Sequence, residues 1–309
     1  MKLRSNLHMN MNDDMHQVTV TSWHQLLYFF GYIKRYNIRI SGFPKSSDDL
    51  STWSKKINKA IRDHYEKDYA SIDKFIKKML FNFNEDKSQI HEIEFILDSK
   101  IICMFAWLYI RQCNTREKQV INGVQKIPLY TDFHLPSQSQ NHDERCYDIS
   151  DYFSHGYLSG KEKDKITNSI QDTSLRIIND IKPLSWLDEK NDEQCEWACD
   201  YILKRYTPKN IDIDKPWNTH ERYLFVHGLF SLMVAIENES KWKLFLTDIN
   251  RAWSQKKHRA NKKEQSPLNT YLDKKTKEKL KALCINNGVS IQTMLSHLIT
   301  TEYNKTKGK

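Results

Sequence analysis

The chain has 309 residues and a formal net charge of +9, and 28% of its residues are charged while 39% are hydrophobic. These proportions are typical of a globular protein with one to three domains. The scarcity of Gly (8) and Pro (7) favours a mainly helical chain over a β-sandwich or barrel. The positive charge indicates a polyanionic partner, with nucleic acid favoured over an anionic membrane surface.

No secretory or membrane-spanning segment is expected. Residues 1–14 are polar and lack the apolar core of a signal peptide. The longest apolar run, residues 101–110, is about half of the roughly 20 residues that cross a bilayer. The six cysteines show no disulfide framework, so we expect reduced thiols and a cytoplasmic protein.

Hydrophobic periodicity predicts most of the chain to be helical. Apolar side chains spaced three and four residues apart predict helices over residues 23–36, 49–65, 72–81, 88–113, 161–181, 193–206, 218–236 and 240–258. The expected organisation is a disordered N-terminus (1–16), a helical domain of unknown role (17–183), a helical bundle (186–258) and a C-terminal domain (259–304). Residues 114–159 lack periodicity, so we expect a long irregular segment there.

Two sets of residues could bind a metal ion. Cys195 and Cys199 are spaced for one helical face, with His220 and His227 nearby in sequence. No tight Cys-x-x-Cys pair is present, however, and two small residues on a buried face are the favoured interpretation. The run from His142 through Asp143 to Glu144 lies in the irregular segment, where a polar loop is favoured over a metal site.

Catalytic signatures are weak. Glu94 with Asp98 and Lys100 superficially resembles the acidic and lysine residues of a metal-dependent nuclease, but the surrounding pattern is helical rather than stranded. The sequence contains no Gly-rich phosphate loop and no Gly-x-Ser-x-Gly motif. We therefore expect no enzyme, no cofactor and no metal.

The C-terminal segment begins with a short alternating run. Leu268, Thr270 and Leu272 share one side of a predicted strand, and Asn269 and Tyr271 share the other. A five-residue strand needs a partner, and the same strand of a second copy is the simplest one. The expected product is a homodimer with an intermolecular two-stranded ribbon, whose Asn269 and Tyr271 read base edges in the major groove of double-stranded DNA.

Two helices follow this run. The first, residues 275–286, is expected to bury Leu280, Leu283 and Cys284, and Asn287 with Gly288 ends it. Ser290 is expected to cap the second helix, whose positive end suits a phosphate. The expected buried stripe of the second helix is Met294, Leu295, Leu298 and Ile299.

Basic charge is concentrated next to this motif. Residues 251–281 hold eleven Lys or Arg against three acidic residues, an excess of eight, which nearly equals the net charge of the chain. A solvated helix face normally mixes both signs, so the excess favours phosphate contacts. The expected phosphate-contacting residues are Arg251, Lys256, Lys257, His258, Arg259, Lys262, Lys263, Lys274 and Ser290.

The segment from Leu272 to Ile299 resembles the ribbon-helix-helix DNA-binding family without a gap. The chain from about residue 190 is also similar to the macrodomain Ter family, which organises the chromosome terminus. The residues that carry this similarity are Trp197, Tyr201, Lys204, Glu237, Asn238, Glu239, Arg251, Lys256, Lys257, His258 and Arg259. The resemblance implies a nucleoid-associated dimer whose helical bundle and ribbon-helix-helix domain both contact a short palindromic site. It covers only about 40% of the chain and does not extend to residues 1–185.

The sequence therefore predicts a mainly α protein with a helical N-terminal domain, a helical bundle and a ribbon-helix-helix domain. Its predicted function is sequence-specific double-stranded DNA binding as a homodimer, in nucleoid or replicon organisation or in repression. The alternative is an antitoxin- or defence-type protein whose N-terminal domain binds a protein partner. A nuclease in the N-terminal half is a third, less favoured hypothesis.

Overall fold

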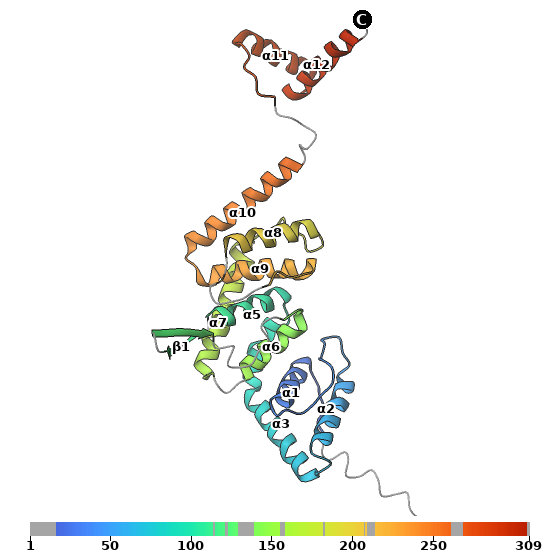
Figure 1. Ribbon diagram of the computed structural model, residues 1–309, viewed down its shortest axis with the longest axis vertical. Helices are drawn as coiled ribbons and strands as arrows, with labels where there is room; N and C mark the ends of the chain where they lie inside the picture. The colour runs from blue at the N-terminus through green and yellow to red at the C-terminus, as the bar shows by residue number, and fades with distance from the viewer. Residues whose placement is uncertain are drawn as a thin grey trace, which may run out of the picture. The chain divides into compact units, whose positions relative to one another are not determined.

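The computed structural model is mainly helical and divides into two compact units, Met1–Ala252 and Trp253–Lys309 (Figure 1). It describes residues 17–113, 115–120, 123–128, 139–154, 158–181, 183–206, 208, 214–260 and 268–307. The expected disordered N-terminus, residues 1–16, lies outside this part of the chain. No helix among the described residues is long and apolar enough to cross a membrane.

The first unit begins with three helices around an aromatic-rich core: α1 (Trp23–Arg35), α2 (Leu50–His64) and α3 (Tyr69–Glu92). Ser22 caps α1 by accepting a hydrogen bond from the Gln25 N–H, and Asp49 caps α2 in the same way. The buried Asn58 side chain accepts from the Val18 N–H and donates to the Val18 carbonyl, both at 2.8 Å. This pair of bonds fixes the segment that leads into α1.

A larger core follows in the same unit. Its helices are α4 (Glu94–Leu97), α5 (Lys100–Cys113), α6 (His142–Ser154), α7 (Gly160–Arg176) with the π-helical turn η3 (Ile177–Ile181), α8 (Asp192–Arg205), α9 (Thr219–Ile236) and the first half of α10 (Glu239–Ala260). The α5 and α9 backbones approach closely at Gly228. A Cβ atom added there would lie 2.6 Å from Met104 Cγ and 3.3 Å from the Met104 backbone carbon. Only glycine permits this spacing.

This larger core crosses the boundary that we expected near residues 183–186. Ile166 and Leu184 belong to the same buried cluster as Cys199 and Leu229. The structure instead places the division between the units within α10, after Ala252. Helix α9 is buried on both faces. Helices from before and from after residues 183–186 therefore pack against it, and the two predicted domains share one core.

The expectation of an irregular segment over residues 114–159 is wrong for α6. Strands β1 (Thr115–Val120) and β2 (Gly123–Pro128) also pair there as an antiparallel hairpin. Helix α6 escaped detection because its buried face contains Arg145, Asp148 and Asp151 beside its apolar residues. These charges mask the hydrophobic period that marks a helix.

The described part of the second unit consists of the end of α10, residues 268–273, α11 (Lys274–Asn287) and α12 (Ile291–Lys307). Asp273 caps α11 by accepting from the Thr276 N–H, and Gly288 ends it with a φ of +62°. Both the stop at Gly288 and the Ser290 cap of α12 confirm the sequence-based prediction.

The predicted two-stranded ribbon is wrong. Residues 268–273 form no strand and are exposed. A short strand is stable only when hydrogen-bonded to a neighbouring edge, and among the described residues no strand lies against this segment. The predicted burial of Leu283, Leu298 and Ile299 is also wrong for the single chain, because these side chains are exposed.

Candidate functional site

The second unit carries the net charge of the chain. Residues 253–309 contain thirteen Lys or Arg and four Asp or Glu, an excess of nine that equals the +9 of the whole sequence. The first unit contains 35 residues of each sign and is therefore neutral. Any long-range attraction of a polyanion is thus directed to the second unit, which includes the end of α10.

The predicted phosphate-contacting side chains lie mainly on the last turns of α10. Arg251, Lys257, His258 and Arg259 are exposed there, and Lys256 extends over the Trp253 ring, with its Nζ 5.5 Å from the ring centroid. This contact restricts the lysine side chain while its ammonium group stays near the surface.

The other predicted contacts lie at helix starts or outside the described residues. Lys274 is the exposed first residue of α11, and Lys262 and Lys263 belong to residues 261–267, which the structure does not describe. Ser290 Oγ accepts from the Thr293 N–H at 3.1 Å, so it is engaged in capping α12. The remaining free N–H groups of the first turn of α12 can still face an anion.

The predicted base-reading residues are exposed. Asn269 and Tyr271 lie in residues 268–273, which precede α11 and have no regular secondary structure, and the Tyr271 ring is fully exposed. Leu268 and Leu272, expected on the opposite, buried side, are exposed as well. The alternation of apolar and polar residues over 268–272 therefore does not produce one buried face and one exposed face in the single chain.

The second unit also leaves much of its apolar surface uncovered. Its buried hydrophobic cluster among the described residues consists of Leu280, Cys284 and Met294, with Leu295 packed against it. The large apolar side chains exposed on α11, α12 and the turn between them are Leu283, Ile285, Val289, Ile291, Leu298, Ile299 and Tyr303. A helix pair with so small a core gains little from hydrophobic burial by itself.

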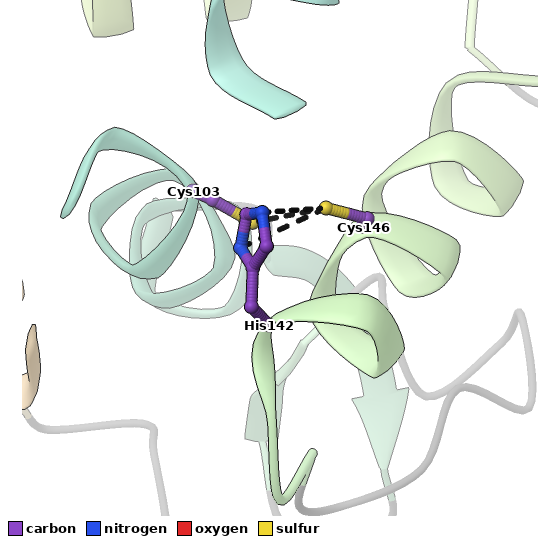
Figure 2. A group of neighbouring side chains, drawn as sticks. All are labelled: Cys103, His142 and Cys146. Atoms are coloured by element: carbon purple, nitrogen blue, oxygen red, sulfur yellow. Dashed lines mark hydrogen bonds between the residues drawn. The ribbon is translucent and has the colours of Figure 1, made fainter. Parts of the chain in front are cut away.

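The structure brings together a second group that the sequence did not predict: Cys103 of α5 with His142 and Cys146 of α6 (Figure 2). The two Sγ atoms lie 3.8 Å apart, and Cys146 Sγ lies 3.5 Å from His142 Nε2. One ligand atom from each residue lies within 4.8 Å of the others. Both cysteines are fully buried, whereas His142 is partly exposed.

The two thiols differ in acidity. Burial raises the pKa of Cys103, but hydrogen bonds with Cys146 and His142 outweigh burial and lower the pKa to about 6. The pKa of Cys146 is raised by its hydrogen bond with Cys103 and by burial. The pair therefore holds one thiolate and one thiol near neutral pH, and the Cys146 thiol can donate to the Leu97 carbonyl 3.6 Å away.

Sequence reasoning missed this cluster for a physical reason. His142 was considered with Asp143 and Glu144, its neighbours in a presumed loop, whereas helix α6 places it beside Cys146 four residues later. Recognition of α6 as a helix would have revealed the His-x-x-x-Cys pair. Cys103, from the preceding helix, could only be found from the packing of α5 against α6.

The same helix α6 carries three ion pairs, and in each of them the charged side chain that comes from α6 is buried. The Arg145 guanidinium donates to both oxygens of Glu221 on α9, at 2.7 and 3.1 Å. Asp148 lies 4.0 Å from Arg111 and accepts from the Trp107 indole, and Asp151 lies 3.3 Å from Arg35. Helix α6 thus links α1, α5 and α9 through polar contacts inside the core.

The other candidates for chemistry have ordinary partners. Burial raises the pKa of Cys195 to about 11 and that of Cys199 to about 12, as expected for unreactive thiols. Glu94 lies 3.3 Å from His24 and 2.7 Å from His91, while Asp98 lies 3.8 Å from His24. The two carboxylates that superficially resemble a nuclease site, Glu94 and Asp98, therefore belong to a cluster of carboxylates and histidines at α4.

A rival anion-binding feature lies in the first unit. A surface cavity between the end of α1 and α2 is lined by Lys34, Arg39, Lys56 and Lys59, with Asp63 at its edge. The excess of positive charge suits a phosphate. It is the main alternative location for contact with a nucleic acid.

No protein-family model, curated protein or solved structure matches the chain. Its function therefore has to be inferred from the residues and geometry described above.

Proposed function

We propose that this chain is a sequence-specific double-stranded DNA-binding protein that acts as a homodimer through its second unit. The observation that supports this most strongly is the location of the charge: an excess of nine positive charges lies in residues 253–309, next to a neutral first unit. Phosphate neutralisation by Lys and Arg supplies most of the affinity of DNA-binding proteins and makes it depend on salt.

The basic end of α10 supplies the phosphate contacts in this proposal. Lys257, His258 and Arg259 are exposed on consecutive positions, and Lys256 adjoins them. Contacts of this kind position a protein on the duplex but carry no sequence information. They predict binding that weakens steeply as salt rises, whatever the sequence.

Sequence preference is assigned to Asn269 and Tyr271. Both are exposed beside the N-terminus of α11, which attracts phosphate. The Asn amide has both a donor and an acceptor, and it can pair with the N6 and N7 positions of adenine. Tyr271 offers a hydroxyl group and an apolar ring for the thymine methyl group.

The homodimer follows from the uncovered apolar residues of the second unit. Leu283, Ile291 and Ile299 are exposed on α11 and α12, where the single chain has only a small core. A second copy is the occupant proposed here, because two identical basic units would then present their charge to two half-sites of one palindrome. The resemblance to the macrodomain Ter family favours nucleoid or replicon organisation over simple repression as the role of this binding.

The test is selection of bound fragments from a random pool of duplexes, followed by affinity measurements on the selected site. The double variant Asn269→Ala with Tyr271→Ala should lose the preference for that site but keep most of its non-specific affinity. Thr301→Ala with Asn304→Ala, at two exposed polar positions of α12, is the control and should keep the preference.

Two results would contradict the proposal. One is an unchanged site preference in the Asn269 and Tyr271 variant, which would remove the base-reading assignment. The other is a salt-insensitive chain that purifies with a stoichiometric protein partner on its first unit, which would favour the protein-interaction hypothesis.

A further inference from the structure

The cluster of Cys103, His142 and Cys146 has the dimensions of a tetrahedral metal site. With zinc–sulfur bonds of about 2.3 Å and a zinc–nitrogen bond of about 2.0–2.1 Å, tetrahedral angles place two sulfurs about 3.8 Å apart and a sulfur about 3.5 Å from the imidazole nitrogen. The structure has 3.8 Å between the sulfurs and 3.5 Å between Cys146 Sγ and His142 Nε2. We infer that these three side chains bind a zinc ion.

The donor set supports zinc over other common ions. Two thiolates and one imidazole are soft or intermediate ligands, which calcium and magnesium do not select. His142 and Cys146 occupy the same face of α6, and Cys103 meets them from α5, so the three donors converge from two helices (Figure 2). The fourth position of a four-coordinate zinc ion would lie open on the side of His142, whose side chain is partly exposed.

The protons balance simply. Zinc binds each cysteine as a thiolate, so a thiol that is still protonated releases its proton to solvent as the ion binds. His142 donates the lone pair of one ring nitrogen to the ion.

The site has a structural role in this assignment. Both sulfurs are fully buried, so the ion would join α5 to α6 inside the first unit. Arg145 lies three residues after His142 on α6 and pairs with Glu221 of α9. A zinc ion at the start of α6 would therefore hold this helix in the position that its buried ion pairs require.

The test is a metal titration of the full-length, reduced protein. Cobalt(II) is the spectroscopic probe, because thiolate coordination gives it a sulfur-to-cobalt charge-transfer band, and zinc then displaces it in competition. We expect one zinc per chain and a rise in melting temperature on binding. Cys103→Ser and Cys146→Ser should each weaken zinc binding by more than about 100-fold, since even the loss of an outer-shell partner costs about 10–100-fold.

Cys199→Ser is the matched control, because Cys199 is equally buried in the same unit but lies on α8. It should bind zinc as tightly as the unaltered chain. His142→Gln serves as a second test at a partly exposed position, where folding is less at risk. It should keep the charge-transfer band but bind zinc more weakly.

The inference is overturned if the reduced chain takes up no zinc, or if Cys199→Ser loses as much affinity as Cys146→Ser. It is also overturned if the reduced chain oxidises to a Cys103–Cys146 disulfide in the presence of excess zinc. A disulfide needs sulfurs about 2.05 Å apart, so the two cysteines would have to move together.

Discussion

The two units of this chain differ in the size of their hydrophobic cores and in their net charge. The first unit buries two large hydrophobic clusters and contains equal numbers of acidic and basic residues, 35 of each. The second has only a small cluster of three buried apolar side chains, Leu280, Cys284 and Met294, among its described residues, and it carries the entire net charge. The comparison teaches that stability is concentrated in the first unit and attraction of polyanions in the second, so substitutions should affect one property at a time.

The largest expected effect is on the stability of the first unit. Arg145→Met leaves Glu221 buried without its partner, and breaking a buried ion pair in this way costs about 3–5 kcal/mol. Urea unfolding followed by circular dichroism measures this loss. The double variant Arg145→Met with Glu221→Leu should recover most of it, since no buried charge then remains. A single variant as stable as the unaltered chain would contradict the account.

The second effect should appear in binding and not in stability. Replacing Lys256, Lys257 and Arg259 by Gln removes three proposed phosphate contacts. The slope of log affinity against log salt should fall by about 3, and affinity at moderate salt should drop on the order of 100-fold. Fluorescence anisotropy with a labelled duplex over a salt series measures both quantities.

The matched control changes three exposed lysines of the first unit, Lys161, Lys165 and Lys190, to Gln. It removes the same charge from the chain but none from the second unit. Affinity should fall by much less than in the other triple variant. Equal losses in the two variants would mean that net charge, and not its location, governs binding.

A third effect concerns acid stability. Burial lowers the pKa of His227 to about 4, and its Nε2 atom is buried without a hydrogen-bond partner. Because the folded pKa lies below the unfolded value of about 6.5, the contribution of His227 is fully present above pH 6.5 and is lost as pH falls toward 4. The loss between pH 7 and pH 5 should be about 2 kcal/mol. His227→Leu should flatten the unfolding free energy over this range, and an unchanged pH profile would disprove the assignment.

The smallest effect should come from a single methyl group. Gly228→Ala places a Cβ 2.6 Å from Met104 Cγ, so α5 and α9 must separate, at a cost of at least about 1 kcal/mol. Gly160→Ala is the control, because nothing lies within 4 Å of a Cβ there. Thermal melting of the two variants should differ, and equal melting temperatures would show that the interface between α5 and α9 can relax.

The sequence predicted those helices whose buried faces are apolar. The periodicity of α1, α2 and α8 marked them to within a residue or two at each end. Helix α6 was missed because Arg145, Asp148 and Asp151 occupy its buried face, where a sequence pattern expects apolar side chains. Tertiary ion pairs compensate these charges, and no local rule reveals such partners.

The candidate sites show the same limit. The basic residues of the second unit can be read from the sequence, and the Ser290 cap, which follows from a local pattern, is confirmed. The predicted ribbon is absent from the structure. Residues 268–273 would form a strand only beside the edge of another strand, and their alternating apolar and polar side chains do not supply one. The cluster of Cys103, His142 and Cys146 depends on the packing of two helices, which spacing along the chain cannot show.

The central claim is that DNA contacts the second unit. Hydrogen–deuterium exchange of the full chain, with and without a duplex at low salt, tests it most directly. The account predicts added protection confined to residues 253–307, strongest at the end of α10 and the start of α11. Protection centred instead on the basic cavity lined by Lys34, Arg39, Lys56 and Lys59 would contradict it.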